Sequence, residues 1–199
     1  LIDNPDNKKR FADKFGTELK IPQTWEENLR LQEFLMDPSK DLYGSGNLRN
    51  RANGPTWWYM IFYSAGGFPF DDDMKPTIDT PGGQYAVDLY LQDKKVNHPE
   101  AANWGTPQMI PRIAQGHVVS CQYWDGTCKT IANPKQSKTV DQFYFSLVPG
   151  SKFSGKMVHR SISSPLAAIL INKYSPRKAQ GAYMALWLGS GKNSIPIVS

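Results

Sequence analysis

Cysteine and histidine are scarce in this 199-residue chain, which limits the metal and redox chemistry open to it. The two cysteines, Cys121 and Cys128, are seven positions apart and have no Cys-x-x-Cys motif or histidine pair beside them. That spacing argues against a zinc site. A local disulfide would form in an oxidising compartment, unless the local geometry holds the two Cα atoms beyond about 7 Å. The sequence leaves the bridge open, and we expect neither a metal nor a cofactor.

Long hydrophobic runs and blocks of like charge are also absent. No apolar run reaches the ~18 residues that a membrane-spanning helix needs, and the first residues do not resemble a signal peptide. The net charge is +5, and the short basic runs Lys8–Arg10 and Lys94–Lys95 lie among acidic residues. Such runs are typical of solvated helix faces, so we expect no nucleic-acid partner. With 40% hydrophobic and 21% charged residues, the composition is that of an ordinary globular protein.

Motifs of the common enzyme classes are missing as well. The sequence has no Gly-x-Ser-x-Gly, no Gly-x-x-x-x-Gly-Lys and no Gly-x-Gly-x-x-Gly between a strand and a helix. The histidines, His98, His117 and His159, have no partner at a spacing typical of a triad or a metal site. The acidic run Asp71–Asp73 lacks the alternating oxygen ligands of a calcium loop, which indicates a solvated turn. We therefore predict no catalytic residue, and a protein that is not an enzyme.

Aromatic residues, by contrast, are plentiful: they make up 12% of the chain and include six tryptophans. Three adjoining rings, Trp57, Trp58 and Tyr59, lie between Gly54-Pro55 and Gly66-Gly67, a pattern that favours a helix bounded by turns. At ~100° per residue the rings spread over about 200° of that helix. Either the helix is buried on two sides, or at least one ring faces a cleft, where it suits a sugar, a base or a cation.

The caps, breakers and apolar runs predict alternating helices and short strands. Helices are expected to begin near residues 7, 24, 54, 80, 106 and 175, and strands to cover 41–44, 117–124, 143–148 and 166–171. This order predicts an α/β fold, with helices on both faces of a mixed sheet and ligands at the C-terminal ends of its strands. Trp25 and Trp187 are expected in the core. The polar loop that carries Asn47 and Arg49 could border a cleft, but a solvated position is favoured.

Four segments, taken in order, resemble one protein family. They are Lys20–Glu27, Ser64–Gly67 with Pro76–Pro81, Ile113–Ser120 with Trp124 beyond it, and Val148–Gly150 with Ser163–Pro176. Each is similar to a stretch of the family-1 extracellular solute-binding proteins of bacterial ABC importers, a group that includes sugar-binding proteins. The resemblance implies a type II periplasmic-binding-protein fold and a periplasmic, or extracellular and membrane-tethered, location. It also implies capture of a solute without any chemistry on it.

The resemblance further implies an arrangement in lobes. Complete members of that family are considerably longer and have two lobes joined by a hinge. Residues 1–162 resemble most of the second lobe. Residues 163–199 resemble a crossing strand and helix that return to the first lobe, of which the rest is absent.

A solute site between the lobes follows from the same resemblance, because such lobes close on their ligand. Trp57 and Trp124 resemble the aromatic residues of the family's cleft, Thr56 offers a hydroxyl at a helix start, and Asp125 offers an acceptor. The remaining candidates for ligand contact are Trp58 (for which a core position is favoured), Tyr123, Arg160, Ser163 and Ser164. Such a site suits a sugar, an oligosaccharide or a polyol, which a monomer would deliver to a membrane permease.

Two other functions remain open from the residues. A hydrolase acting on glycans would need two carboxylates about 5–10 Å apart, and Asp125 with one of Asp71–Asp73 are the candidates. A scaffold that binds another protein would use exposed aromatic rings as its contact surface.

Overall fold

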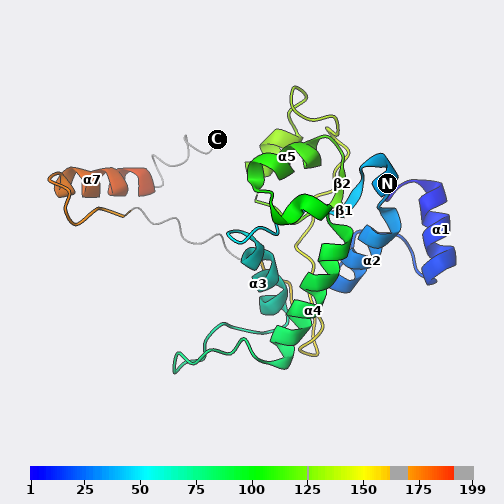
Figure 1. Ribbon diagram of the computed structural model, residues 1–199, viewed down its shortest axis with the longest axis horizontal. Coiled ribbons are helices and arrows are strands. Elements are labelled where there is room, and N and C mark those ends of the chain that lie inside the picture. Colours follow the sequence, from blue (N-terminus) through cyan, green and yellow to red (C-terminus); the bar gives the residue numbers. More distant parts are fainter. Residues whose placement is uncertain (125, 162–169, 191–199) are drawn as a thin grey trace. The chain divides into compact units, whose positions relative to one another are not determined.

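The computed structural model describes residues 1–124, 126–161 and 170–190, and its contacts group the chain into two compact units, Leu1–Ile162 and Ser163–Ser199 (Figure 1). The helices of the first unit are α1 (Pro5–Phe15), α2 (Trp25–Leu35), α3 (Gly54–Ser64), α4 (Pro81–Val96), α5 (Thr106–Ala114) and α6 (Gly126–Ile131), with 3-10 turns at Pro38–Lys40 and Pro99–Ala102. Its strands are β1 (Tyr43–Ser45) and β2 (Val118–Ser120), and the second unit carries α7 (Lys178–Gly189).

Local signals in the sequence set the helix ends. The capping box predicted at the start of α2 is confirmed: the Thr24 hydroxyl accepts the N–H of Glu27 at 3.2 Å, and the Glu27 carboxylate accepts the N–H of Thr24 at 3.3 Å. Thr80 caps α4 by accepting the N–H of Gly83 at 3.2 Å. Gly16 follows α1 with φ 67°, a left-handed conformation that glycine adopts without a Cβ penalty.

The sheet is smaller than the sequence led us to expect. The described residues form a two-stranded parallel sheet with Tyr43 opposite Val118 and Ser45 opposite Ser120, so the α/β class holds while the mixed sheet reduces to one pair. The prediction of a strand at 143–148 is wrong, because these residues do not pair with another strand. The stretch is followed only by isolated bridges, between Thr24 and Gly150 and between Ser151 and Val158. The strand predicted at 166–171 falls mostly outside the described residues.

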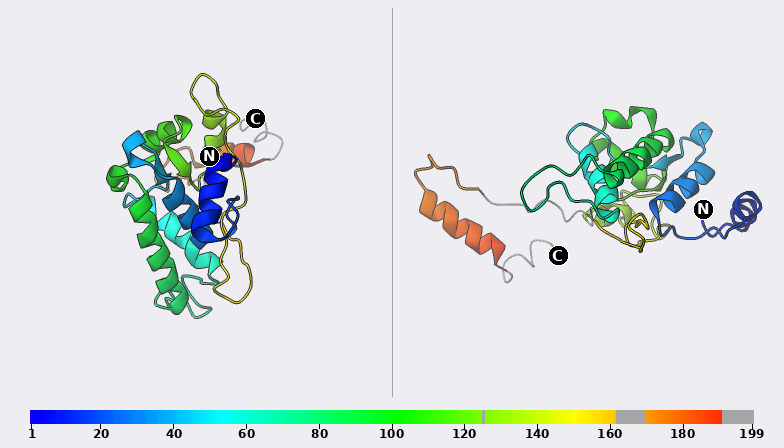
Figure 2. Two further views of the ribbon diagram at one scale, coloured as in Figure 1. Left: turned by 90° about the vertical axis from the view of Figure 1, so that its right-hand side faces the viewer. Right: turned by 90° about the horizontal axis from the view of Figure 1, so that it is seen from below.

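The core lies where α2, α3 and α4 meet beside β1. In Figures 1 and 2, α3 and α4 lie side by side, and α2 packs against α4 and β1. Phe62 of α3 is fully buried there, and the indole N–H of Trp25 on α2 donates to the Ser64 hydroxyl of α3 at 2.8 Å. The core position predicted for Trp25 is therefore confirmed. Trp187 on α7 was predicted to be buried, but it is 44% exposed.

Among the described residues, no helix is both long enough and apolar enough to cross a membrane.

Candidate functional site

Trp57 occupies the first turn of α3 and reaches across to the chain that follows β2. Its side chain is 3% exposed, and its indole N–H donates to the backbone carbonyl of Gln122 at 3.0 Å. From the sequence, Trp57 was expected to present a face to a cleft. The structure instead buries its ring behind Tyr123 and Trp124, the two residues that follow Gln122. Trp57 therefore supports the rings that form the surface and does not form the surface itself.

Those next residues, Tyr123 and Trp124, complete a group of three aromatic rings. The ring centroids of Trp57 and Trp124 are 5.7 Å apart with planes at 83°, and those of Tyr123 and Trp124 are 5.4 Å apart at 85°. Edge-to-face contacts of this kind add about 0.5–1.5 kcal/mol each to ordinary burial. Tyr123 is half-buried and Trp124 is 36% exposed, so Trp124 offers the most open ring of the three. We call these residues the aromatic triad.

A groove of about 740 Å³ runs beside the triad, within the first unit. Its walls come from the chain around β2 through Trp124, from α6, from residues 139–149 and from the first three residues, with further contributions from α2, the residues just before it and Leu42. The volume falls within the ~300–1,000 Å³ of ordinary small-molecule sites. Tyr123 and Trp124 line the groove, whereas Trp57 does not. Within the described part of the chain, its ionisable side chains include the carboxylates of Asp3 and Asp141 but no lysine, arginine or histidine.

The hydroxyl of Tyr123 is buried and has no hydrogen-bond partner among the described residues. Burial, the largest cause, raises the pKa of Tyr123 well above its usual value, so the group is a neutral phenol that can both donate and accept. A buried polar group left without a partner costs about 1–3 kcal/mol. Because this oxygen is itself buried, a solute in the groove does not reach it in this structure, although Tyr123 lines the groove with its other atoms.

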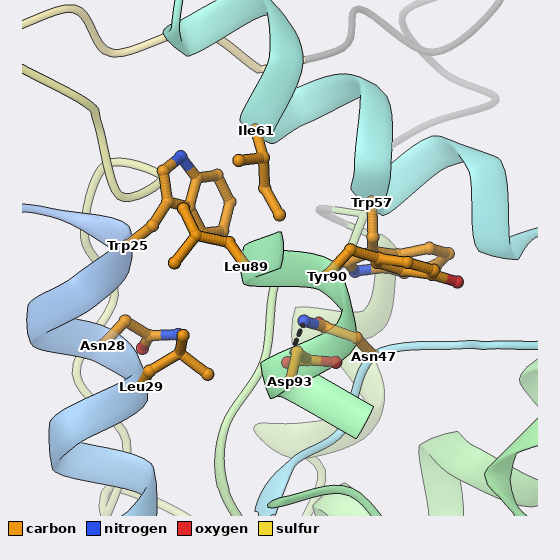
Figure 3. A pocket seen from close by; sticks show the side chains of 9 residues that line it. All are labelled: Trp25, Asn28, Leu29, Asn47, Trp57, Ile61, Leu89, Tyr90 and Asp93. Carbon is orange, nitrogen blue, oxygen red and sulfur yellow. Dashed lines mark hydrogen bonds between the residues drawn. The ribbon is translucent and has the colours of Figure 1, made fainter. Parts of the chain in front are cut away.

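A second cavity, shown in Figure 3, lies behind the triad between α2, α3 and α4. At about 10 Å³ it has room for roughly one water molecule. It is therefore not a solute site. Polar groups of Asn28, Asn47 and Asp93 line it, among apolar side chains that include Trp25 and Trp57.

Asn47 and Arg49 were predicted to be solvated, and this prediction is wrong. Asn47 is 4% exposed, and the Arg49 guanidinium donates to the buried Asp93 carboxylate at 2.9 Å. Arg49 also donates to the carbonyl of Tyr90 at 2.9 Å and lies 3.9 Å above its ring. Burial raises the pKa of Asp93, while hydrogen bonds from Ser45 and Asn47 and the charge of Arg49 oppose that rise. The sequence contains a signal that would have found this pair. Leu89, Asp93 and Val96 lie on the buried face of α4, and a carboxylate buried there requires a partner.

The other predicted contacts do not line the groove. Thr56 is partly buried, and its N–H donates to the carbonyl of Asn53 at 2.9 Å. Trp58 stacks on Phe62 with a centroid distance of 4.8 Å and packs against the core. Arg160 is exposed, with its guanidinium 5.2 Å from the centroid of the Phe68 ring. The last three predicted contacts, Asp125, Ser163 and Ser164, lie outside the described residues.

The two cysteines and the acidic run Asp71–Asp73 have the following places in the structure. Cys121 and Cys128 are both free thiols and both line the groove, and burial raises the pKa of Cys121 to about 12. Asp71–Asp73 does not line the groove, because it lies in the loop between α3 and α4. Within that loop, the Asp71 carboxylate accepts the N–H of Lys75 at 2.8 Å. No group of three histidine, cysteine or acidic residues in the described part is placed to hold a metal.

Residues 6–188 match the family model described as bacterial extracellular solute-binding protein. This match covers most of the chain. The chain belongs to the bacterial extracellular solute-binding protein family. Family membership places it in the periplasm or outside the cell, and it agrees with the resemblance carried by the four sequence segments.

Similar proteins carry two kinds of description. A probable amino-acid ABC transporter periplasmic-binding protein of Sinorhizobium fredii is 25% identical over 135 residues, which are 67% of this chain and 31% of that protein. Among solved structures, a solute-binding protein of Agrobacterium radiobacter in complex with ribitol has a TM-score of 0.69 at 21% identity, covering 95% of this chain and 47% of that one. One of Agrobacterium vitis with bound D-mannitol has a TM-score of 0.68 at 20% identity, covering 96% and 45%. These structures support the type II binding-protein fold. The chain spans less than half the length of each relative.

Proposed function

We propose that this chain belongs to the solute-binding component of an ABC importer, which captures a neutral sugar, oligosaccharide or polyol and delivers it to a membrane permease. In this proposal residues 1–162 form the second lobe, residues 163–199 return toward the first, and the solute lies between the lobes without being altered. The observation that carries the proposal is the partly exposed ring of Trp124 at the wall of a 740 Å³ groove, with Trp57 buried behind it.

An aromatic wall suits a polyhydroxy solute for a physical reason. The C–H face of a sugar or polyol is apolar and can lie on the Trp124 ring, while its hydroxyls need polar partners at the rim. The side chains of Ser120, Gln122 and Thr127 line the same groove. These groups are neutral, and they offer donors and acceptors together.

The charge of the groove favours a neutral solute over an amino acid. An α-carboxylate is costly to bury unless a cation or several N–H donors face it. The described lining contains no basic side chain, so the α-carboxylate of an amino acid would have no basic partner there, whereas a neutral solute needs none. The relative from Sinorhizobium fredii carries an amino-acid description, and the relatives that share the fold hold D-mannitol and ribitol. The electrostatics of this chain favour the second kind of solute.

The test is calorimetric titration of the purified protein with D-mannitol, ribitol and maltose, and in parallel with leucine and glutamate. We expect the neutral polyhydroxy solutes to bind and the amino acids not to bind. Trp124→Ala should weaken polyol binding by about 1–3 kcal/mol, which is roughly 5- to 150-fold in Kd.

Phe70→Ala is the matched control, since Phe70 is an exposed aromatic residue that does not line the groove. It should change Kd less than about twofold. Preference for an amino acid would refute the proposed solute class, and an unchanged Kd in Trp124→Ala would refute the site. Release of reducing ends from maltose would revive the hydrolase alternative. A stable complex with another protein, and no solute bound, would revive the scaffold alternative.

We also propose that the working protein is a monomer. Light scattering coupled to size-exclusion chromatography would test this directly.

A further inference from the structure

We infer that Asn47 is a positioning residue for the proposed solute site: its side chain fixes the backbone at Gln122 and so orients Tyr123 and Trp124 in the aromatic triad. The inference rests on the proposed function and adds to it a residue that touches neither the groove nor a solute. Asn47 lies 75 positions before Gln122, and the two side chains meet in the buried interior.

The contact continues the parallel sheet past its last pair. Ser45 is opposite Ser120 in the β1–β2 ladder, and the N–H of Gly46 donates to the carbonyl of Ser120 at 3.1 Å. Two residues further on, Asn47 and Gln122 stand where the next pair would be. Here a side chain replaces the main chain. The Asn47 Oδ1 accepts the N–H of Gln122 at 3.1 Å, and Asn47 Nδ2 donates to Gln122 Oε1 at 2.8 Å.

The orientation of the Asn47 amide is fixed from behind. Its Nδ2 also donates to the Asp93 carboxylate at 3.2 Å, the bond drawn in Figure 3, so two acceptors face the nitrogen and one donor faces the oxygen. Turning the amide over would set its oxygen against both acceptors. The backbone is held as well, because the side chain of Asn97 donates to the carbonyl of Asn47 at 2.7 Å.

Gln122 is also hydrogen-bonded to one member of the triad. Its carbonyl accepts the indole N–H of Trp57 at 3.0 Å. The N–H, the side-chain oxygen and the carbonyl of Gln122 are therefore all engaged, two by Asn47 and one by Trp57. Tyr123 and Trp124 are the next two residues of the chain. Their ring positions depend on where this clamp holds the backbone, so loss of the Asn47 amide should loosen the wall of the groove.

Asn47→Asp is the sharpest test, because the side chain keeps its shape but loses the donor and places a second carboxylate beside Asp93. The first readout is hydrogen exchange of the tryptophan indole N–H groups by NMR, which needs no solute. We expect exchange of the Trp57 indole to quicken at least about tenfold, while that of Trp25, bonded to Ser64, stays within about twofold. The second readout is Kd for D-mannitol and ribitol, which should rise about tenfold or more.

Leu35→Ala is the control for simple loss of stability, since Leu35 belongs to the separate cluster between α1 and α2 and does not line the groove. It should leave the Trp57-to-Trp25 exchange ratio and Kd within about twofold.

If Asn47→Asp does not fold, Asn47→Ala removes the amide without adding charge and should shift both readouts by about threefold or more. An unchanged Trp57 indole and an unchanged Kd would overturn the inference. If no form of the protein binds either polyol, the proposed function fails, and the exchange readout still decides whether Asn47 positions the triad.

Discussion

The reactivity of the Cys121 thiol tests whether the chain that follows β2 is buried as the structure describes. This half-buried thiol lines the groove beside the core, and burial raises its pKa to about 12. At pH 8 such a thiol is about one part in 10⁴ thiolate, whereas an ordinary thiol of pKa about 8.5 is roughly one quarter thiolate. The thiolate of the more basic thiol is also the more nucleophilic. With a Brønsted slope of about 0.4–0.5, its rate constant is higher by a factor of roughly 25–55, which offsets part of the lower thiolate fraction. The net expectation is a reaction roughly 40- to 100-fold slower than in an unfolded chain.

The assay uses Cys128→Ser, which leaves Cys121 as the single thiol of the chain. The rate of reaction with an aromatic disulfide reagent at pH 8 is measured for the folded protein and again in urea, so that the unfolded chain serves as its own reference. Folded and unfolded rates within about fivefold of each other would refute the burial of Cys121. A saturating polyol should slow the folded reaction further, because solute and reagent would compete for one groove. The unaltered protein should show two free thiols by mass.

Two further predictions concern the frame around the site. Ser64→Ala leaves the buried indole N–H of Trp25 without its 2.8 Å partner and should lower the free energy of unfolding, measured in urea, by about 1–3 kcal/mol. In a Trp25→Phe background the same substitution should cost about 1 kcal/mol less. If the effects of the two substitutions simply add, the hydrogen bond is contradicted. Burial and the charge of Arg112 lower the pKa of His98, whose neutral Nδ1 accepts the N–H of Glu100 at 3.1 Å. The folded state therefore binds fewer protons than the unfolded one, and stability should fall as pH drops below about 6.5. His98→Asn keeps a capping acceptor and should flatten this dependence of Tm on pH, so equal slopes in the two proteins would contradict it.

The parts of the fold that depend on neighbouring residues could be predicted from the sequence. The capping box at Thr24, the glycine stop at Gly16 and the proline-led starts of α3 and α4 each need only a few adjacent side chains. The strand predicted at 143–148 failed for the opposite reason. A strand exists only where another backbone pairs with it, and no apolar pattern states whether that partner is present.

The site was half predictable for a related reason. The aromatic residues were visible as a composition signal, and Trp57 and Trp124 do meet, at 5.7 Å. Which of them is covered could not be read from the spacing along one helix, because the residues that bury Trp57 come from the chain after β2, 65 positions away. A helical face predicts only that a side chain points inward or outward with respect to its own element.

Asn47 and Gln122 show where this limit lies. A polar loop of Asn, Arg and Gly residues resembles solvated chain, and polar side chains are exposed more often than not. The exception here arises because the parallel register that pairs Ser45 with Ser120 carries Asn47 and Gln122 to the same level, where β1 and β2 have already ended. Backbone groups buried at the end of a ladder need partners, and a side-chain amide can supply both a donor and an acceptor at once. Burial of this amide thus follows from the end of the sheet, and the same contact fixes where Trp124 stands. The contact between Asn47 and Gln122 therefore contributes both to the stability of the fold and to the shape of the proposed site, which is why an isosteric change at Asn47 should affect both.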